Sequence, residues 1–335
     1  MRLATIFLAV LLLGACHNGD SSSPVDLPGT IGSLILFGES EACVIQDIPY
    51  FPSHDSYSCI DEDGYHYQID IPALREINTA IMLIHGSGSD ADESRGMLAN
   101  NSPYHTLADK LLIYPQAKRY LYGSSLWNGS GERQPGDNGC CVNSGLSDRQ
   151  FISRLVEDVD TTLPSAPFHM VGLSNGGMLA LDLAYNTQLR VHTYFIVVAS
   201  DQTTTMSNTT IDTNIVMIGA RDDEVIPFYG GLLDFSGHEA YVGLVNAGNH
   251  QVSAPAFGDT VEMLLSIKDC VAGSSGASGA GYAWVSNYHC EQGMLATMVF
   301  DVSGHRLGSY SLVDETPQRL GVMAFISQWI ESAGI

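Results

Sequence analysis

Residues 168–178 read Phe168-His169-Met170-Val171-Gly172-Leu173-Ser174-Asn175-Gly176-Gly177-Met178 and contain a Gly-x-Ser-x-Gly motif. An apolar run typical of a buried strand precedes the motif, and a helical pattern follows it. A strand that leads directly into a helix turns sharply at the serine. Glycines are needed at positions 172 and 176 because larger side chains there would clash in this turn. This context predicts that Ser174 lies at the end of a strand with an exposed, nucleophilic hydroxyl. The alternative is a glycine-rich turn with an idle serine.

Short apolar runs alternate with longer amphipathic runs from Tyr65 onward. Strands are expected at 67–71, 80–84, 111–114, 168–171, 194–198, 215–218 and 295–302, and helices at 148–159, 178–185, 260–267 and 318–332. The Gly, Ser and Ala run at 272–281 is expected to be a flexible loop. The alternation predicts an α/β fold, in which helices cover both faces of a mainly parallel sheet.

A serine hydroxyl needs a general base, and a histidine later in the chain is expected to supply it. His305 follows the last expected strand, where a loop can carry it back over the sheet edge. The alternative for His305 is an ordinary surface histidine. The acid that orients this base is expected just after the strand at 215–218. Asp222 and Asp223 both stand there, and the alternative is that both cap a following helix.

When a serine attacks a carbonyl group, the carbonyl oxygen becomes negatively charged. Two backbone N–H donors are expected to stabilise this oxyanion. Asn175, directly after the serine, is expected to supply one of them. The turn His85-Gly86-Ser87-Gly88 follows an early strand, and Ser87 is the candidate for the second donor, with His85 in a structural role. Trp127 is a candidate for the substrate-binding pocket and, equally, for the core.

The N-terminal sequence MRLATIFLAVLLLGAC has the features of an export signal. One positive residue precedes an apolar stretch that is too short to span a bilayer. The end of this stretch, Leu13-Gly14-Ala15-Cys16, resembles the lipobox of bacterial lipoproteins, in which the cysteine is acylated; a plain secretory signal is the alternative. We expect a signal at 1–16, a flexible tether at 17–33, a short extension at 34–64 and a catalytic domain at 65–335. The protein is therefore expected to be exported, as an outer membrane lipoprotein or an extracellular protein.

The charge balance narrows the possible partners. The chain has 37 Asp and Glu against 14 Lys and Arg, for a formal net charge of -23. A surface this negative repels phosphate backbones, so nucleic acid is not an expected partner. The expected partners are an ester substrate, polymeric in nature, and a membrane reached through the lipid anchor.

The chain has 7 cysteines, and six remain once Cys16 is set aside. An even number in an exported chain suggests disulfides. The candidate pairs are Cys43 with Cys59 and Cys270 with Cys290, and the pairing of Cys140 and Cys141 is left open.

Several blocks, in order, resemble the family of extracellular polyhydroxybutyrate depolymerases and feruloyl or acetylxylan esterases. These blocks lie at 83–86, 113–117, 127–128, 140–141, 147–155, 171–178, 225–228 and 304–305, together with Cys270 and Cys290. The resemblance implies an α/β-hydrolase fold, a Cys270–Cys290 disulfide and a secreted esterase that needs no metal or organic cofactor. Counted back from Pro227, the family's spacing places the acid at Asp223, which we favour. Counted forward from the strand at 215–218, the usual turn of the fold places it at Asp222.

The implied activity is hydrolysis of polyhydroxyalkanoate, or of feruloyl or acetyl esters of polysaccharide, by a Ser174, His305 and Asp223 triad. The chain departs from the family at Arg306-Leu307-Gly308 and at Gly219-Ala220, which border the expected site and leave the substrate open. Two alternatives remain: a serine peptidase of the same fold, and an inactive lipoprotein that binds a polymer. The intact candidate triad, in the expected order, argues against the inactive form.

Overall fold

A mainly parallel sheet of 11 strands forms the centre of the molecule. The computed structural model describes residues 42–46, 51–73, 76–101, 107–118, 125–127, 148–201, 211–232, 253–277, 283–301 and 322–333. The predicted signal and tether, Cys16, Cys140, Cys141 and His305 lie outside the described residues.

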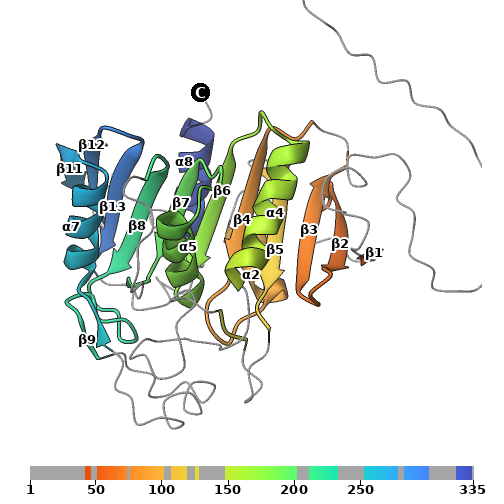
Figure 1. The fold of residues 1–335 in the computed structure, drawn as a ribbon, viewed down its shortest axis with the longest axis horizontal. Helices are drawn as coiled ribbons and strands as arrows, with labels where there is room; N and C mark the ends of the chain where they lie inside the picture. Colours follow the sequence, from red (N-terminus) through yellow and green to blue (C-terminus); the bar gives the residue numbers. More distant parts are fainter. Residues whose placement is uncertain are drawn as a thin grey trace, which may run out of the picture.

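The order of the strands defines the fold (Figure 1). They are β1 (Ala42–Ile45), β2 (His54–Ile60), β3 (His66–Pro72), β4 (Thr79–Ile84), β5 (Lys110–Gln116), β6 (Phe168–Leu173), β7 (Thr193–Val197), β8 (Asn214–Ala220), β11 (Cys270–Ala277), β12 (Ala283–Cys290) and β13 (Met294–Phe300). The spatial order is β1-β2-β3-β5-β4-β6-β7-β8-β13-β12-β11. From β5 to β13 neighbouring strands are parallel, whereas β3 runs antiparallel to both β2 and β5.

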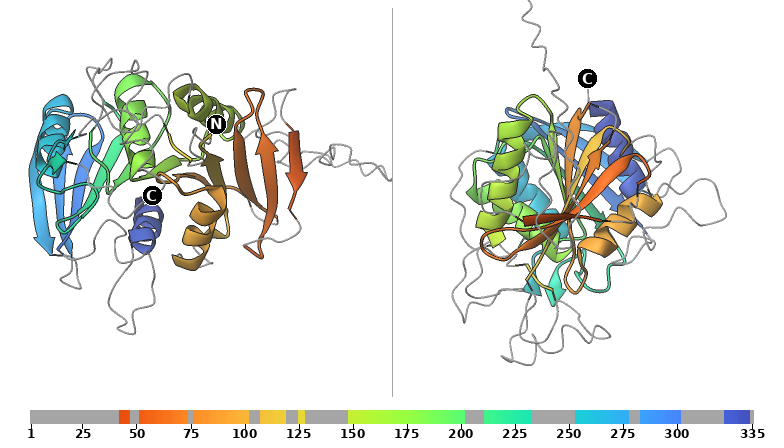
Figure 2. Two further views of the ribbon diagram at one scale, coloured as in Figure 1. Left: turned by 90° about the horizontal axis from the view of Figure 1, so that it is seen from below. Right: turned by 90° about the vertical axis from the view of Figure 1, so that its right-hand side faces the viewer.

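Helices cover both faces of this sheet, as Figure 1 and Figure 2 show. The helices are α2 (Ala91–Asn101), α4 (Asp148–Thr162), α5 (Asn175–Asn186), α7 (Phe257–Ile267) and α8 (Val322–Ala333). The face covered by α4, α5 and α7 and the face covered by α2 and α8 each hold a separate apolar core. Among the eight adjacent strands from β2 to β13, only β3 runs in the opposite direction. The protein therefore has the α/β-hydrolase fold predicted from the sequence.

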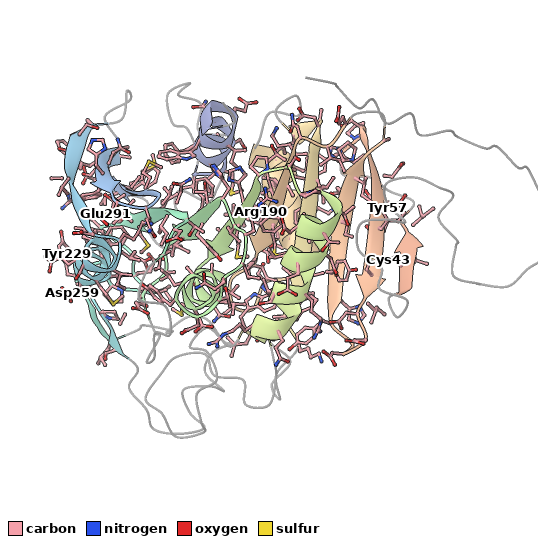
Figure 3. The ribbon with its side chains drawn as sticks, turned by 45° about the horizontal axis from the view of Figure 1, so that its top comes forward. Cys43, Tyr57, Arg190, Tyr229, Asp259 and Glu291 are labelled. Atoms are coloured by element: carbon pink, nitrogen blue, oxygen red, sulfur yellow. A yellow bond between two sulfur atoms is a disulfide. The ribbon has the colours of Figure 1, made fainter. Side chains whose placement is uncertain are left out.

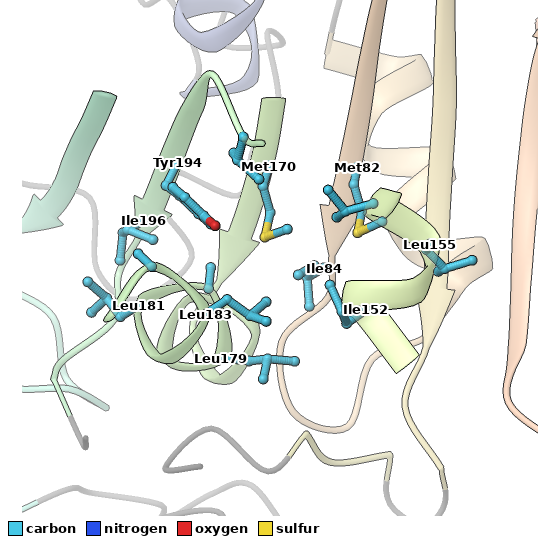
Figure 4. Close-up of a cluster of buried hydrophobic side chains, with 14 of the residues drawn as sticks. Met82, Ile84, Ile152, Leu155, Met170, Leu179, Leu181, Leu183, Tyr194 and Ile196 are labelled. Atoms are coloured by element: carbon cyan, nitrogen blue, oxygen red, sulfur yellow. The ribbon is translucent and has the colours of Figure 1, made fainter. Parts of the chain in front are cut away.

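The continuous apolar runs in the sequence reflect burial on both faces of the central strands. On β4, Met82 and Ile84 point into the core under α4 and α5, and the intervening Ile81 and Leu83 point into the other core. Figure 4 shows Met82 and Ile84 beside Ile152 of α4. A strand that is covered on both sides cannot alternate apolar with polar residues, so its sequence is apolar throughout.

The N-terminal segment joins the same sheet. β1 and β2 pair with each other and β2 pairs with β3, so the predicted extension is continuous with the domain through backbone hydrogen bonds. A disulfide joins Cys43 to Cys59, opposite residues on β1 and β2. Figure 3 labels Cys43 near one end of the sheet and Glu291, in the turn after β12, near the other.

One prediction is wrong at the other edge. A flexible loop was expected at the small-residue run 272–281, but residues 272–277 of this run form most of β11, which pairs antiparallel with β12. Cys270 and Cys290 are opposite each other in this pairing and form a disulfide. Strand pairing uses backbone groups, so a run of exposed small residues becomes a strand once a neighbour is held beside it.

A short antiparallel sheet of two strands, β9 (Gly231–Leu232) and β10 (Ser253–Ala254), lies at the edge of the molecule where the parallel strands end. None of the helices in the described part of the chain is long and apolar enough to cross a membrane.

Candidate active site

Ser174 occupies a strained turn between β6 and α5. Its φ of 51° and ψ of -116° are unusual for a residue that carries a side chain. The backbone N–H of Ser174 donates to the carbonyl of Val197 on β7 at 2.8 Å, which holds the turn against the neighbouring strand. Strain of this kind persists only where the surroundings impose it, and it is concentrated at functional sites. The strand, turn and helix predicted around the motif are therefore present.

The glycines of the motif are required by close backbone contacts. A Cβ atom on Gly172 would lie 2.5 Å from the carbonyl oxygen of Gly176. One on Gly176 would lie 2.4 Å from the carbonyl oxygen of Ile84, at the end of β4. A Cβ atom on Gly177 would lie 2.6 Å from the Cβ of Ala199. α5 can therefore begin directly against the ends of β4 and β7.

The loop after β4 lies against the serine. A Cβ atom on Gly86 would be 3.4 Å from the Cβ of Ser174, which is ordinary van der Waals contact. Ser87, the candidate for one oxyanion donor, is the next residue, and Asn175, the other candidate, is the first residue of α5. The structure thus brings both candidate donors onto segments that adjoin Ser174.

The side chain of Asn175 has a role that the sequence did not indicate. Its Oδ1 accepts from the backbone N–H of Trp127 at 2.7 Å, and its Nδ2 donates to the carbonyl of Trp127 at 3.1 Å. The indole Nε1–H of Trp127 donates to the carbonyl of His85 at 3.0 Å. Trp127 is 0% exposed, so its position is that of a core residue between these segments.

His85 is buried, and its partners determine its tautomer. Nδ1 lies 2.7 Å from the carbonyl of Gly86 and must donate, whereas Nε2 accepts from the backbone N–H of Ala117 at 3.0 Å. Burial lowers the pKa of His85 to about 4. The imidazole is therefore neutral at pH 7, and both nitrogens are engaged in holding the loop.

The two candidate acids differ in burial. Asp222 is exposed, whereas Asp223 is 9% exposed. Oδ1 of Asp223 accepts from the backbone N–H groups of Val225 at 2.9 Å and Ile226 at 2.8 Å. These bonds hold the carboxylate at the end of β8, which is separated from the serine strand β6 only by β7.

The histidine predicted as the base, His305, lies outside the described residues. The chain leads toward it from β13, whose last residue, Phe300, is paired with Ala220 at the end of β8. The backbone N–H of Arg221 donates to the carbonyl of Phe300 at 2.9 Å. The segment that contains His305 therefore starts beside the loop that carries Asp222 and Asp223.

A polar cleft adjoins the loop that carries Ser87. It has a volume of about 560 Å³, and its walls come from β3, the end of β5 and the start of α2. Gly88 and Ser89 form one wall, and Gln68, Asp92 and Ser58 contribute side chains. Within the described residues, no group of three or more His, Cys, Asp or Glu is placed to hold a metal ion.

No family model matches the chain, and no curated protein matches it. Several solved structures are similar at low identity. A carboxylesterase from Bacillus cereus is 8% identical, with a TM-score of 0.46 over 80% of this chain and 94% of that one. A carboxylesterase from Mesorhizobium loti is 14% identical, with a TM-score of 0.45 over 80% and 94%. An acetyl xylan esterase from Aspergillus awamori is 10% identical, with a TM-score of 0.48 over 79% and 94%.

Proposed function

We propose that the protein is a serine hydrolase of carboxylic esters, with Ser174 as nucleophile. The observation that carries this proposal is the strained turn of Ser174, which is held at the junction of β6 and α5 against the loop after β4. A hydroxyl in this position projects beyond the sheet edge, and the start of a helix favours negative charge near it. An idle serine would give no reason to maintain a backbone conformation of this cost.

The proposed reaction is acyl transfer to water. The Oγ of Ser174 attacks the ester carbonyl carbon while His305 accepts the hydroxyl proton, and the carbonyl oxygen becomes an oxyanion. The backbone N–H groups of Asn175 and Ser87 stabilise this charge, and Asp223 orients the histidine. His305 then returns the proton to the departing alcohol, and water releases the acid from the acyl-enzyme by the same steps.

The cleft supports a hydrophilic polymer as the alcohol part of the substrate. β5 and β6 are separated only by β4, so the cleft at the end of β5 lies about 10 Å along the edge from Ser174. Its walls carry amide, carboxylate and hydroxyl groups, such as Gln68, Asp92 and Ser58. Groups of this kind bind sugar hydroxyls better than the apolar backbone of a polyhydroxyalkanoate, so we favour feruloyl or acetyl esters of polysaccharide.

Two experiments test this function. A fluorophosphonate probe should label Ser174 in the wild type, and Ser174→Ala should abolish labelling and turnover of a nitrophenyl ester while leaving the thermal melt nearly unchanged. Normal turnover by Ser174→Ala would refute the mechanism. Release assays on acetylated xylan, feruloylated xylan and polyhydroxybutyrate then decide the substrate, and preferential hydrolysis of polyhydroxybutyrate would refute our preference.

We also propose that the protein is exported and anchored through acylated Cys16. Two disulfides in the described part of the chain support an oxidising compartment. Cys16→Ser should release the protein from membrane fractions or stall its processing. If the variant is processed normally and still fractionates with membranes, the lipid anchor is excluded.

A further inference from the structure

The segment 125–127 is bonded to two parts of the site at once. On one side, the side-chain amide of Asn175 makes two hydrogen bonds with the backbone of Trp127, at 2.7 Å and 3.1 Å. On the other side, the indole Nε1–H of Trp127 donates to the carbonyl of His85 at 3.0 Å. Asn175 is 1% exposed, and Trp127 and His85 are 0% exposed, so water does not compete for these bonds.

These contacts lie on both sides of Ser87. The carbonyl of His85, two residues before Ser87, accepts from Trp127. The backbone N–H of Gly88, the residue after Ser87, donates to the carbonyl of Ser125 at 2.8 Å. Each peptide unit is planar and rotates only about two soft dihedrals per residue. Bonds on both sides therefore limit the directions in which the N–H of Ser87 can point.

We infer that Trp127 and the side chain of Asn175 are positioning residues that hold the two oxyanion donors at one separation and orientation. One donor, the N–H of Asn175, belongs to the start of α5, and the other, the N–H of Ser87, belongs to the loop after β4. Segment 125–127 is bonded to both elements. This inference rests on the proposed function, because it concerns the donors assigned there.

A positioning role and a purely structural role differ in their kinetic effects. Donors that are already oriented stabilise transition-state charge without any reorganisation during the reaction. If segment 125–127 is loosened, stabilisation of the oxyanion falls, whereas binding of the uncharged ester changes little. Positioning therefore predicts a lower kcat at a nearly unchanged KM. A purely structural role predicts a lower melting temperature with both constants unchanged.

The test is Trp127→Phe, which keeps an aromatic ring and removes the indole N–H. The expected result is a fall in kcat on a nitrophenyl ester of about 10-fold to 100-fold, since small misplacements cost up to about that much. The affinity for a trifluoromethyl ketone, which forms a tetrahedral oxyanion adduct with serine, should fall by the same factor as kcat/KM. The matched control is Trp329→Phe, which removes an indole from α8 on the opposite face of the sheet and should change neither quantity.

A second variant and a wild-type measurement keep the inference testable if Trp127→Phe does not fold. Asn175→Ala, which removes both bonds to the backbone of Trp127, should also lower kcat and ketone affinity together. In the wild type, the indole N–H resonance of Trp127 should shift when the ketone binds, and those of Trp284 and Trp329 should not. Unchanged kcat and ketone affinity in folded variants, or an unmoved Trp127 resonance, would overturn the inference. A wild type that neither hydrolyses esters nor reacts with a fluorophosphonate would instead refute the proposed function.

Discussion

Gly176 lies so close to the carbonyl oxygen of His85 that a Cβ atom added to it would be only 2.5 Å from that oxygen. The carbonyl oxygen of Ile84, the last residue of β4, would be equally close, at 2.4 Å. Both oxygens belong to the backbone and cannot rotate out of the way. The start of α5 and the loop after β4 are thus in direct backbone contact, and the glycine of the motif is required by a residue that lies 91 positions earlier in the chain.

Gly176→Ala should therefore be both destabilised and nearly inactive. Overpacking of this kind costs about 1–3 kcal/mol, and displacement of the oxyanion donors lowers kcat by about 100-fold. Gly258→Ala is the matched control, because a Cβ there meets nothing within 4 Å. That variant lies in the first turn of α7 and should be stabilised by up to about 1 kcal/mol with full activity. Urea melts and ester turnover measure both effects, and an active, stable Gly176→Ala would contradict the contact.

Asp223→Asn should lower kcat by a factor on the order of 10⁴ without unfolding the protein. Asparagine retains an oxygen that can accept from the N–H groups of Val225 and Ile226, so the loop should keep its shape. Asp222→Asn, at an exposed position, should retain most of the activity. The measurement is kcat of the two variants on one ester, with circular dichroism as the folding control. A larger loss at Asp222 would transfer the acid role to that residue.

His169 should contribute to loss of stability in acid. Burial, and then the nearby His192 and Lys110, lower its pKa to about 3, and its Nδ1 is buried without a hydrogen-bond partner. The folded state therefore keeps His169 neutral below pH 6.5, where the unfolded chain binds a proton. The free energy of unfolding is therefore unaffected by His169 above pH 6.5 and falls as the pH drops toward 3. At pH 5 the loss due to this group is about 2 kcal/mol.

The variant His169→Leu measures this contribution. At pH 7 its free energy of unfolding should be close to that of the wild type, because the lost side chain has an unsatisfied buried nitrogen. Between pH 6.5 and 5 the free energy of unfolding of the variant should fall less steeply with pH than that of the wild type. The difference in slope should correspond to about one fewer proton taken up on unfolding. Urea melts across this range give the slope, and an unchanged slope would show that another group binds the proton.

Replacing Cys270 and Cys290 together by alanine should destabilise the fold and spare the activity. The two residues are 20 positions apart, and closing a loop of this length contributes about 3 kcal/mol. β11 is separated from the serine strand β6 by β7, β8, β13 and β12, so kcat should stay near the wild-type value. Substitution is preferred to a reducing agent, which would also open Cys43–Cys59. An unchanged melt would mean that β11 pairs with β12 without the disulfide.

The sequence by itself determined the central sheet and the serine turn. β4, β6 and β8 were expected from the short apolar runs at 80–84, 168–171 and 215–218, which are typical of strands covered on both faces. The turn at Ser174 was expected because glycines two residues before and two residues after the serine allow a close approach of backbone that larger side chains would block. Both signals are local, so neither requires knowledge of the chain elsewhere.

The same local reasoning failed at β11 and did not anticipate α2 or β12. β11 is exposed along most of its length, so its side chains carry no periodic pattern, and its structure comes from backbone pairing with β12. α2 has a polar sequence whose helical pattern is weak. Elements of this kind are stabilised by neighbours that the local sequence does not reveal.

Only the tertiary structure decided which residues support the site. Asp222 and Asp223 are chemically identical neighbours, and the path of the backbone after β8 alone buries one and exposes the other. Trp127 lies between His85 and Asn175 because β4 and β6 are adjacent in the sheet, although the three residues are far apart in the chain. Local propensity is set by near neighbours in sequence, whereas such contacts arise only when the sheet brings distant strand ends to one edge.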